Sequence, residues 1–497
     1  MLLSIILLLP APAALAQGAK RDQATFDSAV FLLSQSVRVQ RDNSHTRLLS
    51  ALRQLADPGL APLFNHLIAT EEPRLQIHGL LGLAEAHPQR KLDLVRLAQI
   101  DDETVQRLAV SAAMTFELLD IEQARQIVNW EDMSNDVKLV VAAKLVEQGA
   151  FDKLDILHEA AKSDRLAKQA LANLLLLQLG HADAMAPLER ILSSTAPDRD
   201  EAIVMLLQTA VSFEFDRIAP WALRLARDER ADPDLALSAL SVAMRFRERG
   251  AVELWRQQLQ STTDVARRAR LALAALRISP WVDAGIFDAL VGDADPYIAQ
   301  LGKAGRAIAQ GRDIVEPVIT LVNMGQPVTN QWVLRYAKLY AAEDDAKEIL
   351  RGLILAYDDG HPRLREQRLY AAVEATQVLF DRSPPAAALV IRPILENPKA
   401  DNALVEGILL GLVRTNAPEP QRVIEGLSPF KTADARRLAL LLRARHGEPL
   451  DDVQVDDLAR MVRGGGVARE SLRVQAAWVW LKLTGQTNNA LAEARDG

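Results

Sequence analysis

The sequence predicts an all-α fold, an α-solenoid of about 14 stacked helical hairpins. Apolar residues recur at helical spacing along most of the chain, without the sustained alternation typical of strands. Prolines break the helices at a regular period. The 497 residues also exceed the roughly 250–300 at which a single hydrophobic core stops growing. Stacked hairpins share a continuous core with their neighbours, so they escape that limit.

The stretch LRQLADPGLAPLFNHL (52–67) shows how one hairpin is expected to form. Pro58 lacks a backbone N–H and cannot lie inside a helix, but it suits the first turn of a new helix with Asp57 as the N-cap. One helix should therefore end near Leu55. The next should bury Leu60, Leu63, Phe64 and Leu67.

The period of such breaks places the other hairpins. The spacing is roughly 26–39 residues, within the range of helical solenoids. The most strand-like segment, 314–324, falls where a second helix is expected. A change in the curvature of the solenoid is expected near 380–400. First helices are expected to begin near Pro73, Asp102, Ser134, Asp164, Arg199, Asp232, Thr263, Asp295, Pro327, Pro362, Asp401, Thr432 and Ala468.

Several first helices open with an acidic or proline cap followed by aliphatic, basic and small residues, as in DDETVQRLAVSAA (101–113), SNDVKLVVAA (134–143) and EEPRLQIHGLLGLAEA (71–86). This pattern resembles HEAT-type repeats, most clearly over 48–301. The resemblance implies a scaffold that binds partners on a concave surface, and no chemistry. Tetratricopeptide-like pairs are the alternative, because several periods match that family's repeat length. In the first of these helices the buried face is expected to hold Val105, Leu108, Ala109, Ala112, Phe116 and Leu119.

The first residues, MLLSIILLLPAPAALAQ, predict a secretory signal over 1–16. Ala14-Leu15-Ala16 fits the cleavage pattern, so the mature protein should begin at Gln17, and the solenoid should span 17–497. The apolar run is shorter than the ~20 residues that span a bilayer. A buried N-terminal helix is the alternative. No later segment has the apolar length for a transmembrane helix, so the protein is expected in the periplasm or outside the cell.

Composition and motifs exclude several functional classes. With no cysteine, the chain has no disulfide, thiol nucleophile, Cys-ligated metal or covalently attached haem. The net charge of −7 argues against a general nucleic-acid binder. The acidic pairs 101–102, 451–452 and 456–457 are expected at helix starts, where carboxylates stabilise free N–H groups. With no nucleophile elbow, phosphate loop or H-E-x-x-H motif, we expect neither an enzyme nor a bound cofactor.

Histidines give one alternative to that expectation. Only His158 is followed by Glu, so the repeated His-Glu pairs of di-iron HEAT-like proteins are missing. A four-histidine metal site near the N-terminus is conceivable, but its members lack the short helical spacing that places two ligands on one face. Ordinary turn and surface histidines are the favoured interpretation of His45, His66, His78 and His87.

An arginine-rich segment and an aromatic segment are the candidate binding features. Residues 217–277 hold 12 Arg and no Lys against seven acids, so they carry +5 in a chain of −7. The alternative is that these arginines pair with nearby acids or lie along the core. In QWVLRYAKLY (331–340) aromatic residues recur every four positions beside basic ones, which suits a sugar or peptide ligand or, alternatively, simple core packing. The candidate residues are Arg245, Arg249, Arg267, Arg268, Arg270, Trp332, Arg335, Tyr336 and Tyr340.

These features predict an exported scaffold that mediates protein–protein interaction in the cell envelope. The expected partner is another protein, with an anionic envelope polymer as the second possibility and nucleic acid excluded. The alternative function is an envelope polysaccharide-binding or -processing enzyme, or the helical accessory domain of one. Carboxylates or histidines converging in a groove would distinguish that alternative.

Overall fold

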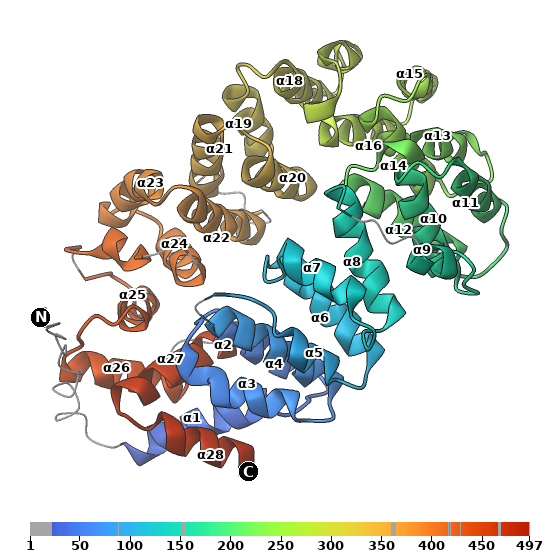
Figure 1. Ribbon diagram of the computed structural model, residues 1–497. Helices are drawn as coiled ribbons and strands as arrows, with labels where there is room; N and C mark the ends of the chain where they lie inside the picture. Colours follow the sequence, from blue (N-terminus) through green and yellow to red (C-terminus); the bar gives the residue numbers. More distant parts are fainter. Residues whose placement is uncertain are drawn as a thin grey trace, which may run out of the picture. The chain divides into compact units, whose positions relative to one another are not determined.

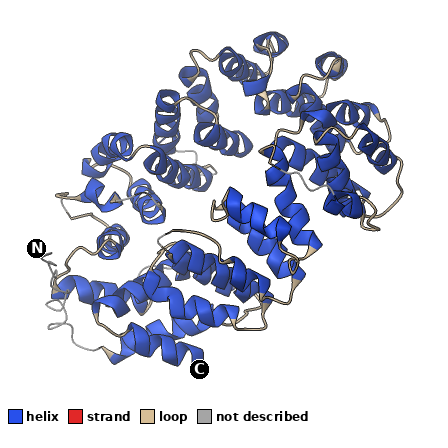
Figure 2. Ribbon diagram, in the orientation of Figure 1, coloured by secondary structure: helices blue, strands red, loops and turns tan. Residues whose placement is uncertain are grey.

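The computed structural model describes residues 22–496 except 88, 151–154, 359–363, 416, 418, 428 and 466–468. Within these ranges the chain forms 28 α-helices and short 3₁₀ turns, with no β-strand (Figures 1 and 2). The predicted all-α fold is confirmed. The predicted signal over 1–16 lies outside the described residues. Among the helices described here, none is long and apolar enough to cross a membrane.

The chain divides into two compact units. Unit 1 combines both ends of the chain, up to Leu118 and from Thr376 onward, and unit 2 holds Leu119–Ala375. The helix α22 (Arg365–Arg382) contains the second boundary. Unit 1 holds α1 (Gln23–Ser36), α2 (Ser44–Arg53), α3 (Ala61–Ile68), α4 (Pro73–Ala86), α5 (Leu94–Ala98), α6 (Glu103–Thr115), α23 (Pro384–Glu396), α24 (Asn402–Arg414), α25 (Ala433–Arg445), α26 (Asp452–Val462), α27 (Glu470–Leu483) and α28 (Thr487–Asp496).

Unit 2 is a run of helix pairs. Neighbouring first helices pack on one another, as α10 does on α12 and α12 on α14, and second helices pack on the first helix that follows, as α13 does on α14. The helices are α7 (Ile121–Asn129), α8 (Asn135–Glu147), α9 (Asp155–Ala160), α10 (Leu166–Gln178), α11 (Met185–Leu192), α12 (Arg199–Ser212), α13 (Ala219–Arg227), α14 (Pro233–Arg245), α15 (Ala251–Ser261), α16 (Val265–Arg277), α17 (Asp288–Val291), α18 (Pro296–Gln310), α19 (Val315–Asn323), α20 (Pro327–Leu339) and α21 (Glu343–Leu355).

The predicted breaks agree with these helix starts, apart from Pro362 and Ala468, which lie outside the described residues. The chain leaves α2 at Arg53, and the carboxylate of Asp57 accepts the N–H of Gly59. After this break the chain does not enter an α-helix directly. It first forms a 3₁₀ turn, Pro58–Leu60, which continues into α3. The strand-like segment 314–324 is helical as expected, since it forms α19. The four apolar residues predicted on the restarted helix are buried: Leu60, Leu63, Phe64 and Leu67.

Two details of the prediction are wrong. Leu108 on α6 and Phe116 just after it are exposed, whereas the polar Gln106 is buried and its amide donates to the carbonyls of Leu97 and Ile100. Those two hydrogen bonds compensate for burying the amide, which hydrophobic periodicity cannot register. The acidic pair 456–457 lies inside α26 and not at its start. Within the helix, Asp457 pairs with Arg460.

Glycines let two first helices approach the helix before them. A Cβ on Gly82 of α4 would lie 2.5 Å from the ring of Phe64, and a Cβ on Gly305 of α18 would lie even closer to Phe287. Real Cβ contacts are never so short, so each glycine makes room for a phenylalanine of the preceding turn or helix. The two positions therefore share one packing solution, a buried ring set on a bare helix backbone.

The two ends of the chain pack together inside unit 1. The last first helix, α27, lies against α2, and α28 lies against α1 and α3 (Figure 1). Gln475 of α27 donates to the carbonyl of Ala51 at 2.8 Å, and Arg463 donates to the hydroxyl of Thr25 at 2.9 Å. The order α25, α27, α2, α4, α6 is thus one continuous layer of first helices. The helix α27 therefore packs on α2 in the position that the first helix of a preceding repeat would take.

Candidate functional site

The most distinctive cavity lies within unit 2, where the first helices α12, α14, α16 and α20 meet the turn after α16. Its volume is about 520 Å³, within the usual range of ligand pockets. We call it the Arg–aromatic pocket. It is lined by Leu207, Gln208, Val211, Ser212, Ser238, Ser241, Val242, Arg245, Arg277, Ile278, Trp281, Val328, Gln331, Trp332, Arg335 and Tyr340.

Arg245 is the buried charge of this pocket. It is the last residue of α14, and its side chain is only 6% exposed. The guanidinium carbon lies 3.6 Å from the ring centroid of Trp281, a close cation–π contact. One of its nitrogens donates to the carboxylate of Glu214 at 3.2 Å. The stacked ring and this one ion pair hold the guanidinium in place at the pocket wall.

Aromatic rings form the rest of the wall. Trp281 meets Tyr340 edge to face, with centroids 4.9 Å apart and an interplanar angle of 80°. Trp332 stacks on Tyr336 at 5.4 Å. Tyr336 is itself buried, and this burial, with a smaller effect from Asp345, raises its pKa to about 12. Tyr336 therefore supports Trp332 from behind as a neutral phenol, and it does not line the pocket.

The pocket is strongly cationic. Three of its 16 lining residues are arginines, and none is acidic. Arg277 and Arg335 are exposed, and neither makes an ion pair or a side-chain hydrogen bond within the described part of the chain. Only Arg245 already has a carboxylate partner. Two free guanidinium groups thus face a half-apolar cavity, which favours an anionic ligand.

The other predicted arginines lie elsewhere in unit 2. Arg268 pairs with the buried Asp293, and Arg270 pairs with Asp234 at 2.9 Å. Arg267 and Arg270 line a different cavity between α13 and α16, whose three arginines are balanced by three acids. Arg249 is exposed between α14 and α15 and lines neither cavity. The structure therefore brings together Arg245, Trp332, Arg335 and Tyr340 from the predicted set.

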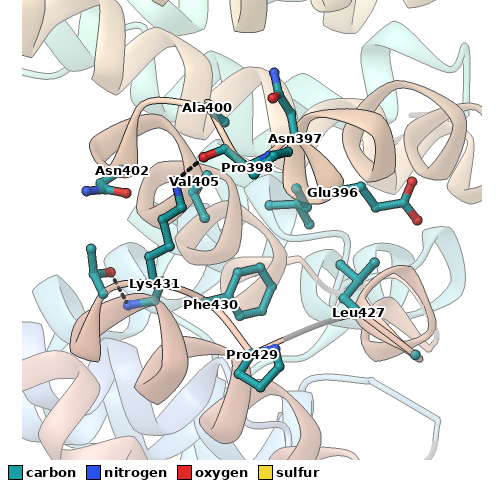
Figure 3. A pocket seen from close by; sticks show the side chains of 14 residues that line it. Glu396, Asn397, Pro398, Ala400, Asn402, Val405, Leu427, Pro429, Phe430 and Lys431 are labelled. Carbon is teal, nitrogen blue, oxygen red and sulfur yellow. Dashed lines mark hydrogen bonds between the residues drawn. The ribbon is translucent and has the colours of Figure 1, made fainter.

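Two cavities in unit 1 are less suited to a charged ligand. One, of about 390 Å³, is lined by a single acid and a single base, and its Lys431 reaches across to the carbonyl of Pro398 (Figure 3). In a neighbouring cavity of about 360 Å³ every arginine already binds a carboxylate or a backbone carbonyl. These arginines are Arg436, Arg437, Arg443 and Arg460.

The N-terminal histidines are not grouped as metal ligands in the described part of the chain. His78 is buried with its Nδ1 3.4 Å from a nitrogen of Arg53, and His87 is exposed at the end of α4. Burial first, and then the charge of Arg53 and the neighbouring His45, lower the pKa of His78 to about 4. No group of three or more potential metal ligands occurs among the residues that the structure describes.

Sequence reasoning missed Trp281 and Arg277. Both lie where α16 gives way to the 3₁₀ turn Ser279–Trp281. Trp281 belongs to a proline break, which the sequence marks as a boundary between helices and not as part of a binding surface. The sequence does contain one indication of this site. Arg245 and Arg277 are the last residues of the first helices of successive repeats, and equivalent positions of neighbouring repeats lie side by side in a stack.

Comparison with known proteins adds no functional assignment. The chain matches no protein-family model and no curated protein. What the Arg–aromatic pocket binds therefore has to follow from its own side chains.

Proposed function

We propose that this protein is an exported, HEAT-like helical-repeat scaffold that binds another protein in the cell envelope, with the Arg–aromatic pocket as its binding site. One observation carries the proposal. Three arginines and three aromatic side chains meet in one cavity whose lining contains no acid. Arginine and aromatic residues are the side chains most enriched at protein-binding hot spots.

The lining favours binding over catalysis. Its polar members are arginine, serine, glutamine and the hydroxyl of Tyr340, and it includes no carboxylate, histidine or lysine. Glycoside hydrolysis ordinarily needs a pair of carboxylates, and a serine nucleophile needs a base beside it. The pocket has neither arrangement, so the polysaccharide-processing alternative gains no support from it.

The lining also favours a protein over a polymer of charged sugars. Five aliphatic side chains share the pocket with the three aromatic rings. Burying an apolar side chain of a partner against them yields about 25 cal/mol for each Å² removed from water. A polyanionic polysaccharide offers mainly hydroxyl and carboxylate groups to such a surface. Of the two partners expected from the sequence, the protein is therefore the better match. The aliphatic members are Leu207, Val211, Val242, Ile278 and Val328.

Comparative capture from envelope fractions tests the proposal. The bait variant R277E/R335E reverses the two unpaired charges of the pocket, and R230E/R312E makes the same change at exposed arginines outside its lining. Circular dichroism first verifies that both variants remain helical. We expect one partner protein to be retained by the wild type and by R230E/R312E and lost with R277E/R335E. Equal capture by both variants would exclude the pocket as the binding site.

A further inference from the structure

We infer that the Arg–aromatic pocket recognises a short acidic peptide segment carrying an aromatic side chain, and that Glu214 competes with the ligand's carboxylate for Arg245 in the free protein. This inference rests on the proposed function, because it specifies the ligand of the same pocket. It assigns separate roles to the buried arginine, the exposed arginines and the rings.

Arg245 is prepared to bind a carboxylate. A guanidinium group has five N–H donors in a planar fork. The structure gives Arg245 one hydrogen bond, the one to Glu214, and none of its nitrogens is both buried and unpaired, so the other N–H groups are accessible to a ligand. Stacking on Trp281 orients the fork and leaves its edge available. A carboxylate in the pocket can accept two parallel hydrogen bonds from such an edge.

Glu214 shows that the guanidinium of Arg245 pairs with a carboxylate. It lies in the link after α12, and its side chain is 70% exposed while it pairs with the buried Arg245. A buried guanidinium is costly to leave unpaired, so the exposed Glu214 carboxylate is exchanged only where another carboxylate takes its place. Glu214 does not line the pocket, so it can turn into solvent without disturbing the lining. A ligand carboxylate therefore competes with Glu214 for the same guanidinium.

The rings and the remaining arginines define the rest of the ligand. Trp281, Trp332 and Tyr340 border the apolar part of the cavity, where an aromatic side chain can stack or meet a ring edge. Arg277 and Arg335 are exposed and unpaired within the described residues, so they can hold acidic residues flanking that ring. An acidic segment with one central aromatic residue matches all three features.

Fluorescence anisotropy with defined peptides tests the ligand class. The probe is a labelled peptide with the core Asp-Glu-Phe-Glu-Asp, and the comparison peptides replace its acids with amides or its Phe with Ser. We expect each replacement to weaken binding about tenfold or more, as for the loss of a charged hydrogen bond or a buried ring. Equal binding of the amide peptide would overturn the assigned carboxylate, and equal binding of the Ser peptide would overturn the assigned aromatic.

Variants test the assigned role of Glu214. E214Q removes the internal competitor and should tighten binding of the acidic probe several-fold, whereas E201Q makes the same charge change on α12 away from the pocket and should not. The gain should disappear in R245K, which keeps the charge and loses the planar fork. Unchanged affinity in E214Q would refute the competition.

A soluble polyanionic polysaccharide added as competitor separates this inference from the proposed function. If the polymer displaces the probe and the affinity of the probe does not depend on its Phe, the ligand is an anionic polymer and not an acidic peptide. If R277E/R335E loses the captured protein but the wild type binds the acidic, amide and Ser peptides equally, the pocket remains the binding site and only the proposed ligand class is rejected.

Discussion

Asp57 and Trp478, 421 residues apart in the chain, are joined by a hydrogen bond of 3.1 Å from the indole Nε1 to the carboxylate. The same carboxylate accepts Lys482 Nζ at 2.7 Å and the N–H of Gly59 at 2.9 Å. Burial alone would raise the pKa of Asp57, but these three donors outweigh it and lower that pKa. Asp57 therefore caps a helix start near the N-terminus and also hydrogen-bonds to α27 of the last hairpin.

This relationship predicts an unusually large effect of D57A. The substitution removes a helix cap and leaves the N–H of the buried Trp478 unsatisfied, so we expect a loss of about 2–4 kcal/mol in the free energy of unfolding. D102A is the matched control, because Asp102 caps only its own helix through Val105. That control should lose about 1 kcal/mol. Urea unfolding measures both, and equal losses would mean that Asp57 acts only as a cap.

The packing of the chain ends predicts a distant effect of truncation. Deleting residues 487–497 removes α28, which lies on α1 and α3. We expect amide hydrogen exchange to accelerate in α1, more than 400 residues away in the sequence, while α12 and α14 in unit 2 keep their protection. In a stack with free ends the effect would be confined to α26 and α27. Unchanged exchange in α1 would contradict the packing of the two chain ends in unit 1.

His78 predicts a pH dependence of stability. Its pKa in the folded protein is about 4, below the ordinary 6.5, because of its burial and the adjacent Arg53 and His45. Between these values the unfolded chain binds a proton that the folded chain does not. The free energy of unfolding should therefore fall as pH drops from 6.5 toward 4, by up to roughly 3 kcal/mol. H78Q should flatten this part of the profile. Parallel profiles for the wild type and H78Q would contradict the assignment.

Trp281 is predicted to organise the pocket through its ring. W281A removes the surface under Arg245 and the partner of Tyr340, and should cost about 2–3 kcal/mol. W281F keeps a ring at this position and should recover more than half of the loss. Thermal unfolding of the two variants provides the comparison. If both variants lose the same amount, stacking on Arg245 contributes nothing.

Much of the fold followed from the sequence because its signals are local. Proline breaks and acidic caps act within one turn, so the starts of α14, α18 and α24 could be placed from Asp232, Asp295 and Asp401. Contacts between distant repeats were not predictable in this way. The hydrogen bond between Asp57 and Trp478 depends on how many repeats intervene and on how each one turns the stack.

The site was predictable in part for the same reason. Trp332, Arg335 and Tyr340 follow one another at helical spacing, so their common neighbourhood was visible in the sequence. Their meeting with Arg245 and Trp281 requires helices from different repeats to converge, and no periodicity within one repeat reports that. Charge counting over 217–277 was too coarse, because acids outside this segment, such as Asp293, pair with its arginines, such as Arg268.

Site-specific photo-crosslinking in the native cells tests the central claim most directly. A photoreactive residue at Gln331 would lie in the pocket lining, whereas one at Gln257 would lie on the exposed face of α15 outside it. We predict a discrete adduct with one protein from position 331, none from position 257, and loss of the adduct when R277E/R335E is added. Adducts from position 257 alone, or an adduct at 331 that persists in R277E/R335E, would contradict the pocket as the partner-binding site.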